Sequence, residues 1–296
     1  MKMMTVFSAV FAALVLQAGP IRFVSHAGNQ YSAPGHSIPA YKVALERKAD
    51  ILKLDLHLTR DNVIVLMHDR TTRRKTGTNL EICKHDYPEL LEKCTYLPVG
   101  GFDKEKIVRL EQALELVRDK PISLWLDMKG YTPKKPERSM QLVDTVMALV
   151  RKYGISDDRL MVATWSGPAL EYMKQKYPEI RRVQHVSISK RADGMYKLNL
   201  SPQEMKPEDI IPCLLKRAEE LGLHGFNLPI DSPYFSRELV QTLQAKGYWI
   251  SSWFVQKAET AEKAAEAGVD AVVTDNLEVV QPAIRKKLSV QADPQK

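Results

Sequence analysis

The chain has 296 residues, of which 44% are hydrophobic, enough for one large domain or two small ones. Its formal net charge of +7 and its pI near 9.1 come from basic residues that are spread along the sequence. This spread favours anionic ligands but gives no basic stripe of the kind that binds nucleic acid, and nothing points to a nucleotide cofactor.

The first residues have the pattern of an export signal. Lys2 precedes an apolar run over residues 6–16, which is the length of a signal-peptide core and too short to span a bilayer. We therefore expect residues 1–19 to be a signal peptide and the protein to be periplasmic or extracellular. A buried first helix is the alternative. No later segment is long and apolar enough to be transmembrane.

Residues 51–58, with the sequence ILKLDLHL, alternate with the period of a β-strand. One face is made of leucines, and the other carries Lys53, Asp55 and His57. An edge strand with a solvated face would explain this pattern. The alternative is a strand whose polar face lines a functional barrel interior.

A second β-branched run, residues 63–67, follows this strand after a tight turn and ends on His68-Asp69. It should pair antiparallel with the first strand, so it cannot be the next strand of a parallel barrel. We therefore interpret residues 59–108 as an insertion that forms a lid or a pocket wall.

Two of the three cysteines lie in this insertion. Cys83 and Cys94 could close a short loop, and a disulfide there would contribute on the order of 3 kcal/mol. An oxidising compartment would allow the bond. Cys213 lies in an apolar helical stretch and fits a core thiol better than a nucleophile, and no cysteine spacing suggests zinc.

The chain alternates short apolar strands with amphipathic helices, and the count and length predict one TIM-type (β/α)8 barrel over residues 20–290, with a tail over 291–296. A doubly wound sheet is the weaker alternative, because no glycine-rich phosphate loop follows the first strand. The predicted strands are residues 21–25, 51–56, 122–128, 160–165, 182–186, 225–228, 248–255 and 271–274. The predicted helices are residues 39–48, 110–117, 139–153, 168–176, 211–221, 236–246 and 258–267.

Chemistry in such a barrel is expected where the strands end. Asp127 and Lys129 share a face of the third strand that should point into the mouth. Carboxylates, imidazoles and ammonium groups together suit phosphoryl chemistry. The polar and aromatic residues at the strand ends are His26, Asp55, Asp127, Lys129, Trp165, His185, Asn227, Trp253 and Asp275.

Short segments between Phe23 and Asp275 form a series with characteristic order and spacing. They are His26-Ala27-Gly28, residues 33–37 (APGHS), Lys53-Leu54-Asp55, residues 59–61 with His68-Asp69, residues 125–129 (WLDMK), residues 253–255 (WFV) and residues 268–275 (GVDAVVTD). This series resembles the motifs of the glycerophosphodiester phosphodiesterase family: HRG, APENT, ELD, TKDG…HD, (I/L)EIK, WTV and GVDGIITD.

The resemblance implies hydrolysis of glycerophosphodiesters to glycerol phosphate and an alcohol. In the family, the histidines that match His26 and His68 act as general base and general acid. A neighbouring glycerol hydroxyl attacks phosphorus, and the resulting cyclic phosphate is then hydrolysed. The resemblance further implies that Lys129 binds phosphate, that Trp253 lines the pocket, and that a divalent cation, Mg²⁺ or Ca²⁺, is held by carboxylates at positions 53, 55 and 127.

This sequence departs from the family motifs at several of these positions. Ala27 replaces an arginine that would contact phosphate, Gly35-His36 replaces Glu-Asn, and Asp127 replaces a glutamate. Lys53 stands where a metal ligand is expected, with Asp55 and Asp127 as the remaining ligands. Like charges about 4 Å apart cost roughly 4 kcal/mol at an effective dielectric near 20, and a divalent ion doubles this cost.

Three outcomes for Lys53 follow. It could replace the metal as a fixed positive charge, as in a metal-independent phospholipase C-like lyase. The site could bind phosphodiesters or phospholipid head groups without turnover. Lys53 could also be an internal ion-pair partner of Asp55 or Asp127, with any metal held elsewhere. The expected partner is a small-molecule phosphodiester, with contact to a lipid surface left open because the sequence does not identify the alcohol group.

Overall fold

The computed structural model describes residues 19–129 and 136–292. Nearly all of the expected signal peptide lies outside these residues. Eight parallel strands form a closed barrel in the order β1-β12-β11-β10-β6-β5-β4-β2, and the pairing of β1 with β2 completes the ring. The (β/α)8 barrel predicted from the strand–helix alternation is therefore confirmed. Within the described residues, no helix is long and apolar enough to cross a membrane.

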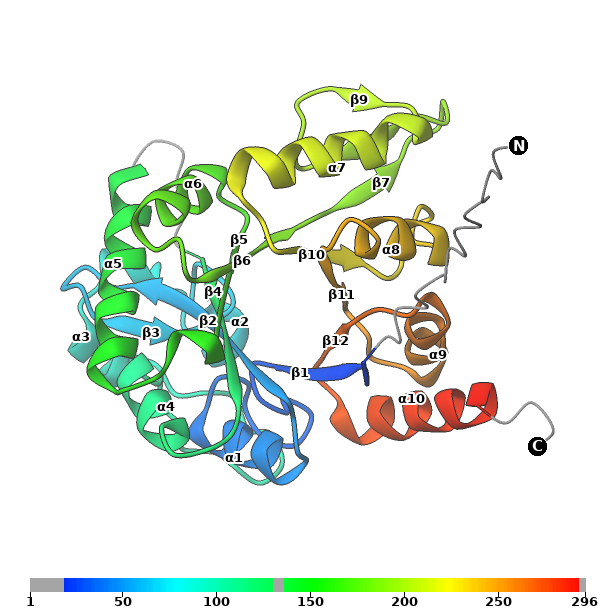
Figure 1. Cartoon of the computed structure of the whole chain (residues 1–296). Coiled ribbons are helices and arrows are strands. Elements are labelled where there is room, and N and C mark those ends of the chain that lie inside the picture. Colours follow the sequence, from blue (N-terminus) through cyan, green and yellow to red (C-terminus); the bar gives the residue numbers. More distant parts are fainter. Residues whose placement is uncertain (1–18, 130–135, 293–296) are drawn as a thin grey trace, which may run out of the picture.

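The barrel strands alternate with helices that surround them (Figure 1). The strands are β1 (Arg22–His26), β2 (Ile51–Leu58), β4 (Ser123–Met128), β5 (Leu160–Thr164), β6 (Arg181–His185), β10 (Gly225–Pro229), β11 (Trp249–Trp253) and β12 (Ala271–Thr274). The helices are α1 (Ile38–Glu46), α4 (Leu110–Val117), α5 (Pro136–Lys152), α6 (Gly167–Lys176), α7 (Pro207–Leu221), α8 (Arg237–Gln244), α9 (Ala258–Ala267) and α10 (Leu277–Ala292), and a 3₁₀ turn, η2 (Asp157–Arg159), precedes β5.

Side chains of the barrel strands belong to two separate cores. The leucines of β2, from Leu52 to Leu58, face outward and pack in the large core between the strands and the helix layer. A smaller core fills the barrel interior and includes Ile51, Trp125 and Met161. Because side chains alternate along a strand, the residues between the leucines of β2 point into the barrel. The polar face of β2 is thus an interior face.

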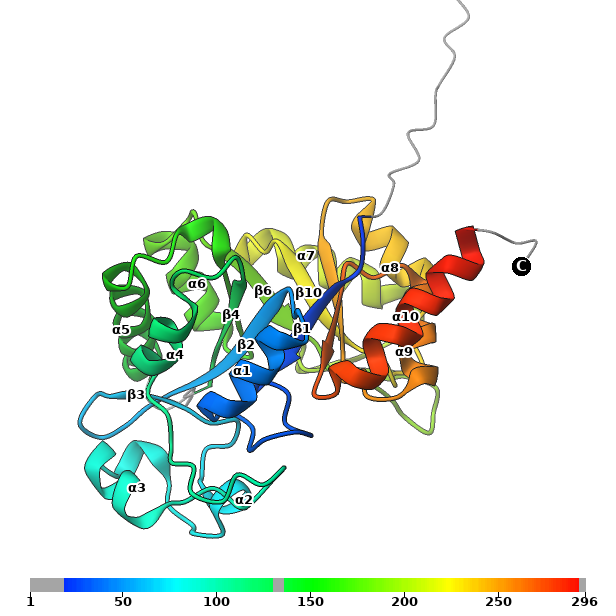
Figure 2. The same cartoon turned by 90° about the horizontal axis from the view of Figure 1, so that it is seen from below.

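The segment after β2 leaves the barrel as expected. β1 ends at His26, opposite Lys53, and the freed edge of β2 then pairs antiparallel with β3 (Ile64–Leu66). Figure 2 shows the following α2 (Arg73–Thr76) and α3 (Tyr87–Lys93) at one end of the barrel. With the 3₁₀ turn η1 (Ile82–Lys84), they enclose a small apolar core of their own.

The structure contradicts the suggested disulfide in this insertion, because Cys83 and Cys94 are both free thiols. Cys94 is buried in the small core of the insertion, whereas Cys83 is exposed and lies 3.4 Å from a carboxylate oxygen of Glu81. The two side chains face different environments, so packing rather than a covalent bond holds the insertion together. Cys213 is half-buried against the main core, as predicted.

Two parts of the fold lie beyond the predicted elements. A three-stranded sheet of β7 (Ile188–Lys190), β8 (Tyr196–Leu198) and β9 (Glu204–Met205) follows β6, and its strands are too short to give a periodic signal. The last helix, α10, is absent from the predicted helices and contains Pro282, a residue that removes one helical hydrogen bond. The expected tail over residues 291–296 therefore begins within α10.

Candidate active site

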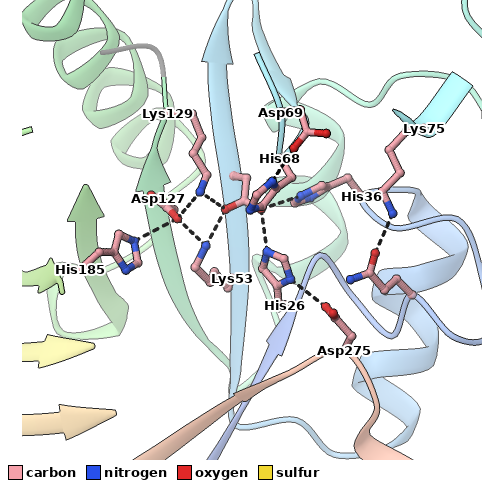
Figure 3. Close-up of polar contacts among 12 residues, drawn as sticks. His26, His36, Lys53, His68, Asp69, Lys75, Asp127, Lys129, His185 and Asp275 are labelled. Atoms are coloured by element: carbon pink, nitrogen blue, oxygen red, sulfur yellow. Dashed lines mark hydrogen bonds and ion pairs between the residues drawn. The ribbon is translucent and has the colours of Figure 1, made fainter. Parts of the chain in front are cut away.

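Two lysines and two aspartates form a buried cluster at the barrel mouth. Asp55 of β2 lies beside Asp127 of β4 in the register of the two strands. The ammonium group of Lys53 donates to Asp55 Oδ1 at 2.5 Å and also to Asp127 Oδ2. Lys129 Nζ lies 2.8 Å from Asp127 Oδ2 and 3.3 Å from Asp55 Oδ1. Two cations thus bridge the same two carboxylates (Figure 3).

The charges in this cluster stabilise one another. Burial by itself would raise the pKa of the Asp55 and Asp127 carboxyls, but Lys129 and Lys53 outweigh it and hold both well below the usual range. Burial would likewise lower the pKa of Lys129, and the two carboxylates raise it instead. All three groups are therefore charged at neutral pH.

His26 lies between two carboxylates. Its Nδ1 is 2.7 Å from Asp275 Oδ1, and its Nε2 is 2.9 Å from Asp55 Oδ2. Burial opposes the charged ring, but Asp55 and Asp275 together raise the pKa of His26 above its ordinary value. The imidazole thus tends to keep its proton, with both ring nitrogens donating to carboxylates.

His68 reaches the same place from the insertion. The backbone N–H of Met67 donates to the Asp55 carbonyl at 3.0 Å, which fixes the chain next to β2. The rings of His68 and His26 lie 5.3 Å apart and nearly perpendicular. Nδ1 of His68 donates to Asp69 Oδ1 at 2.7 Å, and its Nε2 has no hydrogen-bond partner among the described residues. Burial lowers the pKa of His68, in contrast to His26.

His36 is a member of the site that the sequence did not identify. It is fully buried, its Nε2 donates to Asp55 Oδ2 at 2.9 Å, and its Nδ1 accepts from the Tyr41 hydroxyl at 2.7 Å. Burial lowers its pKa to about 4, so the ring is neutral. His36 and Ala27 both have positive φ, at 69° and 56°, a strained conformation that occurs often at functional sites. The only signal in the sequence was the departure from the family's Glu-Asn.

Aromatic side chains continue the site around the rest of the mouth. His185, whose Nε2 lies 3.1 Å from Asp127 Oδ2, stacks on Trp165 at 5.2 Å. Trp165 is 42% exposed and meets Trp253 edge to face, and Trp253 in turn contacts Phe254. The indole N–H of Trp253 donates to a backbone carbonyl, so its ring rather than its N–H is open to a ligand. A wall of aromatic rings therefore connects Asp127 with His26.

Comparisons with known proteins show the family of this chain. The model of the glycerophosphoryl diester phosphodiesterase family matches residues 26–279. This chain belongs to that family. It is 27% identical over 267 residues to a glycerophosphodiester phosphodiesterase of Caldanaerobacter subterraneus subsp. tengcongensis, covering 89% of this chain and 97% of the relative. It is 25% identical to the lysophospholipase D GDPD3 of Homo sapiens, covering 86% and 82% of the two chains.

Solved structures of the family share the fold. A phosphodiesterase of Oleispira antarctica, solved with the product sn-glycerol-3-phosphate, superposes with a TM-score of 0.72 at 21% identity. The match covers 89% of this chain and 96% of that one. A glycerophosphodiester phosphodiesterase of Parabacteroides distasonis gives a TM-score of 0.70 at 22% identity, covering 90% and 98% of the two chains.

Members of this family generally bind a divalent cation, but the side chains here do not fit one between Asp55 and Asp127. The ammonium group of Lys53 lies between the two carboxylates, and four donors already surround Asp55: Lys53, Lys129, His26 and His36. Among the described residues, Asp127 Oδ1 is a buried oxygen that has no hydrogen-bond partner. A single free oxygen falls far short of the six or more ligands that Ca²⁺ requires.

In the part of the chain that the structure describes, one other group of side chains has atoms close enough together to hold a metal ion. His26, Asp55 and His68 each offer an atom within 4.8 Å of the others. This set has two imidazoles and one carboxylate, whereas Mg²⁺ and Ca²⁺ prefer oxygen ligands. The Asp55 oxygen would also have to release its present hydrogen bonds. Neither group fits the cation expected from the family.

Proposed function

We propose that this protein hydrolyses glycerophosphodiesters to glycerol phosphate and an alcohol. The observation that carries the proposal is the pair of imidazoles, His26 and His68, which face each other beside a buried cluster of fixed cations. Family membership and relatives that are named glycerophosphodiester phosphodiesterases support the same reaction.

The hydrogen bonds favour acid–base roles in the opposite order to that implied by the resemblance. The neutral His68 ring, held through Nδ1 by Asp69, has its Nε2 available to accept the proton of an attacking glycerol hydroxyl. The hydroxyl oxygen then bonds to phosphorus as the bond from phosphorus to the leaving alcohol breaks. This alcohol takes the Nε2 proton of the charged His26, which gives up its hydrogen bond to Asp55 for the transfer. In the second step, the two residues reverse these roles as water opens the cyclic phosphate. Two titratable groups whose pKa values are shifted in opposite directions, as in His26 and His68, are suited to act as acid and base at the same pH.

Lys53 and Lys129 supply the positive charge in this mechanism. Both ammonium groups are held in place before substrate binds, so they need not reorganise when negative charge develops at phosphorus. We propose that Lys53 takes the place of the family's divalent cation and that Asp55 and Asp127 position it. His36 then acts as a positioning residue, because it fixes the Asp55 carboxylate next to His26.

Two variants of this function differ in product or substrate. A lyase would release the cyclic phosphate as its final product. A lysophospholipid is the second candidate substrate, favoured by the exposed Trp165 at the mouth and by relatives named lysophospholipase D. Such a substrate would bring the mouth to a lipid surface. A protein that binds phosphodiesters without turnover remains the principal alternative.

We also retain export through residues 1–19 as a proposal.

The first expected result is turnover of sn-glycero-3-phosphocholine. Full-length protein purified without added metal should release choline and glycerol phosphate, detected by an enzymatic choline assay and by phosphorus NMR. The NMR spectrum separates the open phosphate from a cyclic product and so distinguishes hydrolase from lyase. Binding of the substrate without any phosphorus product would reject the enzymatic function and support the binding-only alternative.

The pH dependence follows from the two histidines. His68 must be deprotonated, and its lowered pKa places the acid limb of kcat/KM below pH 6.5. His26 must be protonated, and its raised pKa places the alkaline limb above pH 6.5. We therefore expect a bell-shaped profile with its maximum near pH 6.5, between the lowered pKa of His68 and the raised pKa of His26. A kcat/KM value that rises steadily from pH 6 to pH 9 would contradict these roles.

A further inference from the structure

The charges closest to the two histidines nearly cancel one another. Lys53 and Lys129 share the carboxylates of Asp55 and Asp127. Arg74, on α2 of the insertion, is paired with Asp69 at 2.5 Å. Each of these cations is already paired with a carboxylate before the substrate arrives, so the carboxylates offset most of the positive charge that Lys53 and Lys129 supply. A phosphodiester brings one negative charge, and the transition state for attack at phosphorus carries more.

Lys75 is the exception. Its ammonium group donates to the neutral side-chain amide oxygen of Gln30 at 2.6 Å. Throughout residues 19–129 and 136–292, no carboxylate oxygen lies within the 4.0 Å of an ion pair from this nitrogen. The side chain is half-buried, and a buried cation without a counter-ion costs folding free energy. Such a cost is common for residues that are retained for binding or catalysis.

The hydrogen bond from Lys75 to Gln30 connects the insertion with the loop that follows β1 and His26. Lys75 comes from α2, and Gln30 belongs to the loop between β1 and α1. Figure 3 shows the Lys75 side chain directed towards the side of the site that carries His26 and Asp275. The charged groups that act on it come from three directions: Arg74 and Asp69 of the insertion, Asp275 after β12, and Asp55 of β2.

Local packing leaves the ammonium group close to this loop. A methyl group added to Gly35 would lie 3.2 Å from Lys75 Nζ, so the nitrogen rests against the glycine. The residue after His26 is Ala27, which is buried and uncharged, so the end of β1 contributes no cation on this side. The insertion thus provides the positive charge that the strand end lacks.

We propose that Lys75 is a substrate-binding residue whose ammonium group contacts a phosphate oxygen when a phosphodiester occupies the site. This proposal rests on the proposed function, since it assigns the phosphate contact within the same site. The ligand class is a singly charged phosphodiester or the glycerol phosphate product. Lys75 exchanges its hydrogen bond to the neutral amide oxygen of Gln30 for an ion pair with the phosphate, in which both partners are charged.

Binding of sn-glycerol 3-phosphate to Lys75→Met tests this proposal without requiring turnover. A hydrogen bond to a charged group contributes enough for a loss of about 10- to 100-fold in affinity, measured by isothermal titration calorimetry. KM for glycerophosphocholine should rise by a similar factor, and Lys75→Arg should restore most of the affinity. Arg73→Met, on the same helix but exposed and without an ion pair in the described structure, is the matched control and should bind like wild type.

Thermal unfolding separates a binding role from a structural one. If Lys75 serves the ligand, Lys75→Met removes an unpaired cation, and the ligand-free protein should keep or raise its Tm. Equal affinity of Lys75→Met and Arg73→Met would overturn the proposal, as would a lower Tm with unchanged affinity. Lys75-dependent binding without hydrolysis of any diester would reject the proposed function but leave the Lys75 site intact.

Discussion

Replacing His68 by alanine is expected to lower kcat for glycerophosphocholine by roughly 10²- to 10⁴-fold, the usual contribution of one general acid–base group. His68 is the neutral member of the pair, and its Nε2 is the atom available to take the proton of the attacking hydroxyl. Its ring is partly exposed and its partner Asp69 also pairs with Arg74, so the fold should tolerate the change. KM should change much less than kcat.

His85→Ala provides the control for this measurement. His85 lies in the same insertion, and its Nδ1 is hydrogen-bonded to Glu89 at 2.9 Å, away from the barrel mouth. Both variants should unfold at similar temperatures, and only His68→Ala should lose turnover. His26→Ala should lose turnover as well, with some loss of stability because Asp55 and Asp275 lose a donor. A kcat for His68→Ala equal to that of His85→Ala would remove His68 from the mechanism.

Lys53→Met should damage both stability and activity. The substitution removes one of the two cations that bridge Asp55 and Asp127, and breaking a buried ion pair typically costs about 3–5 kcal/mol. Lys129 remains between the same carboxylates, which favours the lower end of that range. Turnover should fall by at least two orders of magnitude, since a positive charge at the reacting phosphate is lost.

Urea unfolding and steady-state kinetics measure these two effects separately. Lys176→Met is the control, because Lys176 also forms an ion pair, with Asp144, but on the exposed surface. It should leave turnover unchanged and stability nearly so. Lys53→Glu adds a third carboxylate beside Asp55 and Asp127, and its activity should become dependent on added Mg²⁺ or Ca²⁺. Full activity of Lys53→Met would show that Lys53 has only a packing role.

The barrel could be predicted from the sequence because polar and apolar side chains alternate along its strands. Leu52 to Leu58 alternate with Lys53, Asp55 and His57, and the structure places the first set against the helices and the second inside the barrel. Functional side chains in such barrels lie at the C-terminal ends of the strands, and on this basis Asp55 and Asp127 are expected at the same mouth. The structure places the two residues side by side on neighbouring strands. Both predictions depend only on the alternation of side chains along a strand and on the order of the strands in the chain. The conformation of the loops does not enter.

His36 and Lys75 were not predictable in the same way. His36 reaches Asp55 only because the loop after β1 turns through the left-handed residues Ala27 and His36. Lys75 reaches Gln30 because the insertion folds over the mouth around its own small core. Contacts of this kind depend on tertiary packing of irregular segments, for which local pattern gives no information.

The response of wild-type turnover to a chelator shows whether Lys53 replaces a divalent cation in this protein. If Lys53 takes the place of the family's divalent cation, glycerophosphocholine hydrolysis should be unchanged after dialysis against EDTA. Added Mg²⁺ or Ca²⁺ should not raise the rate. Activity that disappears with EDTA and returns with either ion would reject the metal-free role of Lys53, because it would require a metal at a site whose carboxylates are already bridged by Lys53 and Lys129.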